Sequence, residues 1–205
     1  GWAPPTSWMD LADPKYKGKV VVQSASSSTF GLHAFLMFNR IQGGDDRNYE
    51  PGFAKWPAAI GPNVREYLPD SARLAEMIQA DEAVLFPWTP TAITRLKRRG
   101  VHVEYAQPRE GAVILMVGEC VVAKNSEPEL SQKLALYLLS AQAQAKALEK
   151  GGHFPSNRNV LAPAGQADAL QRFQTYMSNA RILDWDQINE ARPAFNARWN
   201  QVIER

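Results

Sequence analysis

Short apolar runs alternate along the chain with longer stretches whose apolar residues recur at helical spacing. The β-branched run V-V-V at 20–22 favours a buried strand, and the apolar residues of 29–42 favour a helix packed on a core. The run A-V-L-F at 83–86 predicts a second buried strand, and Thr89 is placed to cap the helix that follows it. Two strand-to-helix units of this kind are typical of an α/β protein.

Further elements follow from the same patterns and from capping residues. The remaining expected elements are, in chain order, a proline-interrupted helix at 50–60, a strand at 63–67, a helix capped by Asp70, strands at 101–105 and 112–122, a helix opened by a capping box at 126–129 and continuing toward Gly151, and helices at 167–176 and 185–203. Without internal repeats, this order predicts an α/β fold with a mostly parallel sheet flanked by helices.

Composition narrows the class of protein. The chain has 205 residues, 45% of them hydrophobic and 21% charged, which is typical of a globular protein with a sizeable core. A formal net charge of +2 without a basic stripe argues against nucleic acid as a partner. No apolar run approaches the roughly 20 residues of a membrane span. The single cysteine, Cys120, excludes an internal disulfide, and its apolar surroundings predict a buried thiol.

The first residues carry no recognisable targeting signal. They lack the basic start and the apolar stretch of a signal peptide. The opening W-A-P-P-T-S-W resembles an interior segment, so we expect an N-terminal part of a longer protein to be missing from this sequence.

The hydroxyl-rich turn after the first strand is the main candidate site. It contains Ser24, Ser26, Ser27, Ser28 and Thr29, directly before a helix whose dipole favours negative charge at that end. One serine is enough to cap a helix, so this cluster has a purely structural interpretation too. Five hydroxyls in six residues exceed what a cap needs, and we therefore favour contact with a ligand.

The corner after the second expected strand is another candidate. Trp88, Thr89 and Thr91 lie between that strand and its helix, at the end where parallel strands place ligands. An isolated tryptophan more often packs on the core, and this alternative stays open.

Signatures of catalysis are absent from the sequence. No nucleophile elbow, metalloprotease motif or phosphate-binding loop occurs, and we expect no enzymatic activity, cofactor or metal site. The histidines His33, His102 and His153 are far apart, and His33 is expected to be a hydrogen-bonded helix residue. A hydrolase or transferase using Ser27 or Ser28 is the enzyme alternative, but no base stands at a recognisable spacing. Glu119 faces either solvent or a cleft.

The segment Pro5 to Val22, P-T-S-W-M-D-L-A-D-P-K-Y-K-G-K-V-V-V, resembles the entry to the second lobe of extracellular solute-binding proteins of ABC importers. The similar branch holds the spermidine/putrescine-binding and ferric-ion-type proteins. Three further stretches fit in the same order, P-R-E-G-A-V at 108–113, A-K-N-S-E-P-E-L-S-Q-K-L at 123–134 and G-G-H-F-P-S-N at 151–157. The resemblance implies a bilobal, periplasmic-binding-protein-like fold, a periplasmic or lipid-anchored location, and delivery of a small solute to a membrane permease.

Departures from the polyamine-binding members bear on the solute. Those members carry W-M-D where this chain has L-M-V at 115–117, whereas Trp88 matches their tryptophan platform. Because a polycation binds poorly without carboxylates, we expect a small anionic or zwitterionic solute, with a polyamine as the alternative. A ligand-binding effector domain of a transcription regulator is a second alternative. The predicted ligand-binding residues are Ser24, Ser26, Ser27, Ser28, Thr29, Trp88, Thr89, Thr91, Glu119 and His153.

The resemblance also implies a division of the chain. Residues 1–111 would form the second lobe, 112–158 would cross back to the first lobe, and 159–205 would return as C-terminal helices. The expected strand 112–122 would then lack neighbours. Since a long unpaired apolar strand promotes association, we expect a dimer or a domain swap.

Overall fold

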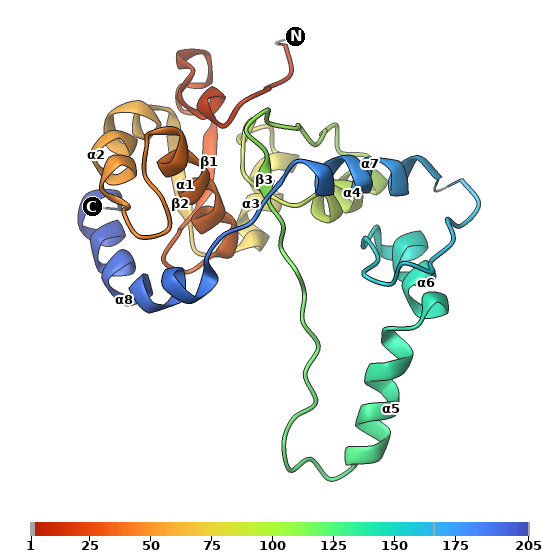
Figure 1. Cartoon of the computed structure of the whole chain (residues 1–205). Helices are drawn as coiled ribbons and strands as arrows, with labels where there is room; N and C mark the ends of the chain where they lie inside the picture. The colour runs from red at the N-terminus through yellow and green to blue at the C-terminus, as the bar shows by residue number, and fades with distance from the viewer. Residues whose placement is uncertain (1–2, 166, 205) are drawn as a thin grey trace.

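The computed structural model describes residues 3–165 and 167–204. Figure 1 shows two groups of elements joined near β3, with α1, α2 and α8 on one side and α4, α6 and α7 on the other. The elements are, in chain order, η1 (Trp8–Ala12), η2 (Pro14–Tyr16), β1 (Val20–Gln23), α1 (Thr29–Ile41), α2 (Glu50–Ala59), η3 (Gly61–Asn63), β2 (Val64–Leu68), α3 (Ser71–Gln79), α4 (Pro90–Arg98), β3 (Ala112–Val113), α5 (Pro128–Leu138), α6 (Ala141–Gly151), α7 (Ala167–Ser178), β4 (Ala180–Arg181) and α8 (Trp185–Val202).

The strands of the described residues form two small parallel sheets. β1 pairs with β2 from Val20↔Val64 to Gln23↔Leu68, and β3 pairs with β4. On the other side of β1, Leu85 forms an isolated parallel bridge with Val20. Strands that run parallel and alternate with helices confirm the predicted α/β class.

Alternate residues of β1 face two different cores. Val20 and Val22 join a large aromatic core between the sheet, α1, α2 and α8, in which Phe35 and Trp199 are fully buried. Val21 points to the opposite face and packs with residues of α3 and α4. The β-branched run is therefore buried on both faces, as the sequence predicts.

Two of the stretches on which the family resemblance rests meet at the junction between the two groups. Ser7 Oγ donates to Glu110 Oε1 at 2.6 Å, and Trp8 Nε1 donates to the Gly111 carbonyl at 2.7 Å. Arg109 N also donates to the carbonyl of Thr6 at 2.8 Å. The loop 108–111 is thereby fastened to the N-terminal segment, directly before the chain enters β3.

Several expected strands are shorter than predicted or absent. The run 83–86 contributes only the bridge at Leu85, and 101–105 forms no strand. The expected strand 112–122 is limited to β3, because no strand of the described residues pairs with 114–122. An apolar run needs a neighbouring backbone to become a strand. Cys120 lies in this unpaired stretch and is exposed, so the prediction of a buried thiol is wrong.

The start of α5 also differs from the prediction. Its N-cap is Glu127, whose side chain makes no capping hydrogen bond, so the expected capping box does not form. Asn125 Oδ1 instead accepts from Glu127 N at 2.9 Å and from Ser131 Oγ at 3.2 Å. The expected continuous helix is broken at Ser140, which caps α6, and Gly152 ends α6 with φ of 68°.

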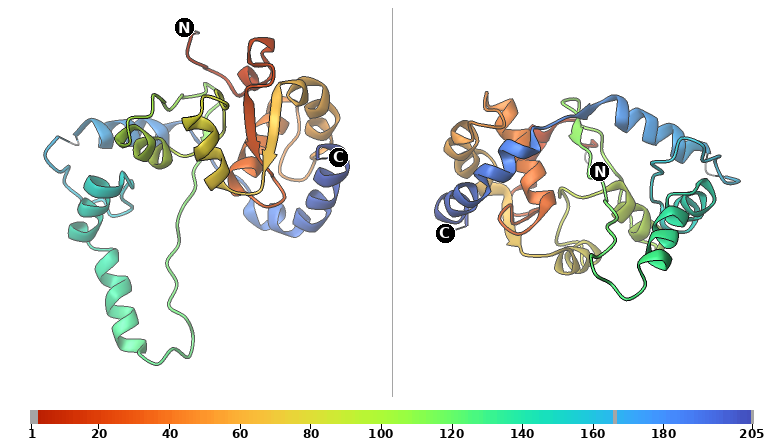
Figure 2. Two further views of the ribbon diagram at one scale, coloured as in Figure 1. Left: turned by 180° about the vertical axis from the view of Figure 1, so that it is seen from behind. Right: turned by 60° about the horizontal axis from the view of Figure 1, so that its bottom comes forward.

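A projecting arm is the most prominent feature of the shape. The extended segment after β3 leads away from the other elements and α5 leads back, as Figure 1 and the left view of Figure 2 show. Among the helices in the described part of the chain, none has both the length and the apolar character that a membrane crossing requires.

Candidate functional site

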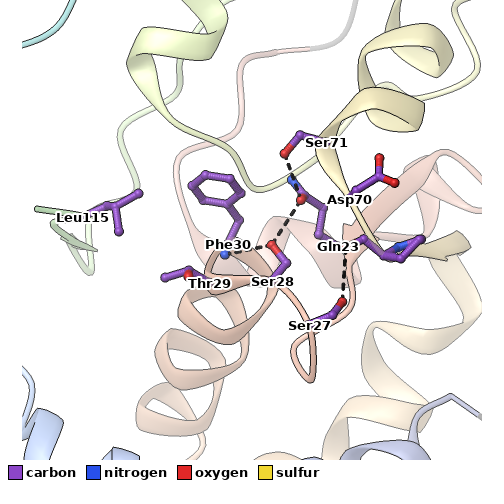
Figure 3. Close-up of a pocket in the computed structure, with 9 residues that line it drawn as sticks. Gln23, Ser27, Ser28, Thr29, Phe30, Asp70, Ser71 and Leu115 are labelled. Atoms are coloured by element: carbon purple, nitrogen blue, oxygen red, sulfur yellow. Dashed lines mark hydrogen bonds between the residues drawn. The ribbon is translucent and has the colours of Figure 1, made fainter. Parts of the chain in front are cut away.

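Two helices begin at the same edge of the β1–β2 sheet. β1 leads through the serine turn (residues 24–28) into α1, and β2 leads through Pro69 and Asp70 into α3. Because β1 and β2 are adjacent and parallel, their carboxyl ends place both helix N-termini side by side. A pocket of about 290 Å³ lies between them (Figure 3), and its lining consists of Gln23, Ser27, Ser28, Thr29, Phe30, Pro69, Asp70, Ser71 and Leu115.

The serine turn divides into structural and pocket-lining residues. Ser28 is the N-cap of α1, and its Oγ accepts from Phe30 N at 3.2 Å. Ser24 and Ser26 share a hydrogen bond of 2.8 Å between their hydroxyls and do not line the pocket. Ser27 lines the pocket and donates to the Pro69 carbonyl at 3.2 Å, which ties the two helix starts together.

Gln23 is a pocket residue that the sequence analysis missed. Its side chain is 1% exposed, and its Oε1 accepts hydrogen bonds from Ser28 Oγ and from Ser71 Oγ, each at 3.1 Å (Figure 3). Its Nε2 has no hydrogen-bond partner in the described structure. The only local signal is a polar residue that ends the run V-V-V-Q.

Asp70 places a carboxylate on the α3 side of the pocket. It is the N-cap of α3, and its Oδ1 accepts from Ala72 N at 2.8 Å and from Arg73 N at 3.3 Å. The sequence analysis identified this residue as a cap but not as part of a site. Hydrogen-bond donors therefore lie on the α1 side of the pocket and a carboxylate lies on the α3 side.

Arg192 of α8 supports the serine turn. Its Nη2 donates to the Ala25 carbonyl at 2.8 Å, and its guanidinium lies over the Phe195 ring at 5.6 Å. Burial lowers the pKa of this guanidinium. Arg192 thus adds a positive charge close to the turn that begins α1.

Trp88 and Thr89 lie outside the pocket lining. Trp88 packs edge-on against Phe86 with ring centroids 6.3 Å apart, at the margin of the core between α3 and α4. Thr89 caps α4 as predicted, accepting from Ala92 N at 3.2 Å. Their contact with a ligand stays a prediction.

Thr91 and His153 meet at the contact between α4 and the end of α6. Thr91 Oγ1 donates to the Gly152 carbonyl at 3.2 Å, and Arg95 Nη2 lies 2.9 Å from His153 Nε2. Glu119 is exposed on the extended segment. None of these three residues lines the pocket, and their role in binding stays a prediction.

Comparison with known proteins identifies the class of protein. The model of the family described as bacterial extracellular solute-binding protein matches residues 1–191. The chain therefore belongs to this family, in agreement with the resemblance of its sequence.

Individual relatives are distant but cover almost the whole chain. A probable ABC transporter periplasmic-binding protein, y4fP, of Sinorhizobium fredii is 22% identical over 98% of this chain and 54% of its own length. The periplasmic binding protein AfuA of Actinobacillus pleuropneumoniae, solved with fructose-6-phosphate, has a TM-score of 0.75 and 20% identity over 99% of this chain and 61% of its own. AgtB of A. tumefaciens R10, solved with agropinic acid, has a TM-score of 0.72 and 18% identity over 98% of this chain and 63% of its own.

These likenesses establish a periplasmic-binding-protein fold, as the sequence predicts. The chain spans little more than half the length of its curated relative and about three fifths of the length of the two solved structures.

Proposed function

We propose that this chain belongs to the substrate-binding component of an ABC importer, and that it captures a small anionic or zwitterionic solute for delivery to a membrane permease. The function requires a periplasmic or lipid-anchored location outside the cytoplasmic membrane. One observation carries the proposal, the meeting of the N-termini of α1 and α3 at one pocket. Two helix dipoles that point at one place favour the binding of negative charge.

The carboxylate of Asp70 extends the proposal to zwitterions. An anionic group would lie at the start of α1, among Gln23 and Ser27, and an ammonium group would pair with Asp70. The distant relatives AfuA and AgtB were solved with fructose-6-phosphate and agropinic acid, both of which carry an acidic group. This agrees with an anionic solute.

A polyamine is the alternative that Asp70 supports. A single carboxylate among hydroxyls and helix N-termini offers one favourable contact to a chain of several ammonium groups. A polyamine would therefore leave most of its charges unpaired in this pocket. Each charge-assisted hydrogen bond that it fails to form would forgo roughly 1.5–3 kcal/mol of binding energy.

The proposal includes a division of the chain between the two lobes of a bilobal binding protein. Residues 1–111 would form the second lobe, 112–158 would cross back to the first lobe, and 159–205 would return to the second lobe as C-terminal helices. The projecting arm with α5 supports a separate role for 112–158. Leu115, at the start of the arm, already lines the pocket and so links the two parts.

A binding panel tests the proposal. Thermal shift and calorimetry would compare inorganic phosphate, fructose-6-phosphate, glutamate, spermidine and ferric ion. We expect the phosphate- and carboxylate-bearing compounds to raise Tm with concentration, because ligands that bind only the folded state stabilise it by mass action. Ser27→Ala should reduce this rise and Ser178→Ala, at the end of α7, should not. Micromolar binding of spermidine without any response to anions would contradict the proposal.

A further inference from the structure

Gln23 occupies the position where the two helix starts meet. It is the last residue of β1. Its side-chain oxygen Oε1 accepts a hydrogen bond from the hydroxyl of Ser28, the N-cap of α1, and another from the hydroxyl of Ser71 at the start of α3. We infer that Gln23 Nε2 donates to an oxygen of the solute's anionic group and so determines the specificity of the pocket. The inference rests on the proposed function and deepens it.

The hydrogen bonds of Gln23 describe the direction of its amide. In the structure Ser28 Oγ and Ser71 Oγ both donate to Oε1, which leaves Nε2 as the polar atom of this side chain without a partner among the described residues. A buried N–H group without a partner lowers the stability of the fold, and native proteins rarely retain one. Gln23 is 1% exposed and lines the pocket, so an acceptor that enters the pocket would remove this cost.

The same bonds decide what kind of group is selected. The Ser28 hydroxyl accepts from Phe30 N and donates to Gln23, so its proton is already used. The proton of the Ser71 hydroxyl is used in the same way. Both hydroxyl protons are therefore engaged by Gln23 Oε1, and the proton donor that remains for a ligand is the Gln23 amide N–H₂. An amide N–H₂ only donates hydrogen bonds, whereas a free hydroxyl could donate or accept. This part of the pocket accepts an oxyanion such as phosphate or carboxylate and rejects an ammonium group.

Side-chain NMR on the unmodified chain tests the inference directly. The Gln23 side-chain amide signals, assigned by their loss in Gln23→Glu, would be followed during titration with inorganic phosphate and, separately, with acetate. We expect them to shift and saturate together with the backbone amide of Phe30. The two titrations distinguish phosphate from carboxylate as the preferred oxyanion.

The variant Gln23→Glu supplies an independent measurement. Glutamate still accepts from Ser28 and Ser71 but offers no N–H, so we expect phosphate affinity to fall roughly 10- to 100-fold. Gln132→Glu, on exposed α5, introduces the same charge away from the pocket and should leave affinity unchanged. The titration of the unmodified chain does not depend on whether Gln23→Glu folds.

The possible failures are separable. Phosphate binding with unmoved Gln23 side-chain signals, or with equal affinity in Gln23→Glu, would overturn the role of Gln23 and leave the proposed function standing. Absence of any response to phosphate and acetate in the unmodified chain, together with tight binding of spermidine, would overturn both.

Discussion

Gly31 allows α1 to begin directly against the end of β1. A Cβ at this position would lie 1.8 Å from the Gln23 carbonyl oxygen and 2.9 Å from Ala25 N, both of which are backbone atoms. The tight return of the serine turn therefore depends on a residue without a side chain. The close contact between the Gln23 backbone and Gly31 also keeps Gln23 next to the start of α1.

We expect Gly31→Ala to destabilise the chain by about 3 kcal/mol, because α1 must shift away from β1 to relieve the overlap. The better helix propensity of alanine, worth about 1 kcal/mol, offsets only part of this cost. Urea unfolding measures the difference. Gly118→Ala, where a Cβ meets nothing within 4 Å, should change stability by less than about 0.5 kcal/mol. Equal stability of both variants would contradict the packing argument.

The serine turn could be predicted from sequence because its chemistry is local. Ser27, Ser28 and Thr29 line the pocket, and their hydroxyls follow one another along the chain. The roles of Gln23 and Asp70 depend on β1 lying next to β2, and no spacing within a single segment reveals that pairing. Sequence reasoning therefore found one wall of the pocket and missed the other.

His33 is a buried imidazole in α1. Its ring lies 5.4 Å from that of Trp185, and its Nε2 has no hydrogen-bond partner among the described residues, contrary to the expectation of a hydrogen-bonded histidine. Burial, followed by the charge of Arg192, lowers the pKa of His33 to about 4. The imidazole is therefore neutral in the folded chain near pH 7.

We expect His33 to weaken the fold in acid. The pKa is about 6.5 in the unfolded chain and about 4 in the folded chain, so between these values the unfolded state binds more protons. The stability that the fold has while His33 is neutral in both states is fully present above pH 6.5. It declines as pH falls to 4, by a total of roughly 3 kcal/mol in the free energy of unfolding. The difference in unfolding free energy between the unmodified chain and His33→Gln should decline over this window. Exposed His102 serves as the control, and an equal decline for His102→Gln would argue against the assignment.

At the level of elements, helices with a strong cap or a strong apolar face formed where the sequence predicted them. Asp70 and Thr89 cap α3 and α4, and α8 follows the expected range 185–203 closely. The strands were less predictable because a strand depends on a partner that is distant in sequence. The run 112–122 is apolar, yet only β3 finds a neighbour, and that neighbour is β4.

The junction of loop 108–111 with the N-terminal segment is a contact between elements that carries its own prediction. Glu110 accepts from Ser7 Oγ, and its backbone carbonyl accepts from Arg181 Nε at 2.6 Å. We expect Glu110→Ala to lower the free energy of unfolding by about 1–3 kcal/mol, since it leaves the hydroxyl of buried Ser7 without its acceptor. Glu110→Gln retains an acceptor oxygen and should lose less. Chemical denaturation of both variants measures the order, and a larger loss for Glu110→Gln would contradict this account.

At the scale of the whole molecule, the arm leaves apolar side chains facing solvent. Met116 is 85% exposed and Val117 is 88% exposed, in a segment that no strand of the described residues pairs with. The next element, α5, has no fully buried residue in the described structure, and leucines such as Leu136 are exposed along it. Unpaired backbone next to apolar side chains favours pairing with a second chain.

We therefore expect this chain to form a dimer or a domain swap through the arm. Sedimentation and light scattering over a wide range of concentration should show a species larger than the monomer. The double variant Met116→Lys/Val117→Lys should shift the equilibrium toward the monomer, because two positive charges repel their counterparts across a paired edge strand. Gln171→Lys/Gln174→Lys adds the same charge at exposed polar positions of α7, outside the arm, and should leave association unchanged. A monomer at every concentration would show that the arm is not a site of self-association, and an equal response of the two double variants would assign the effect to net charge rather than to the apolar segment.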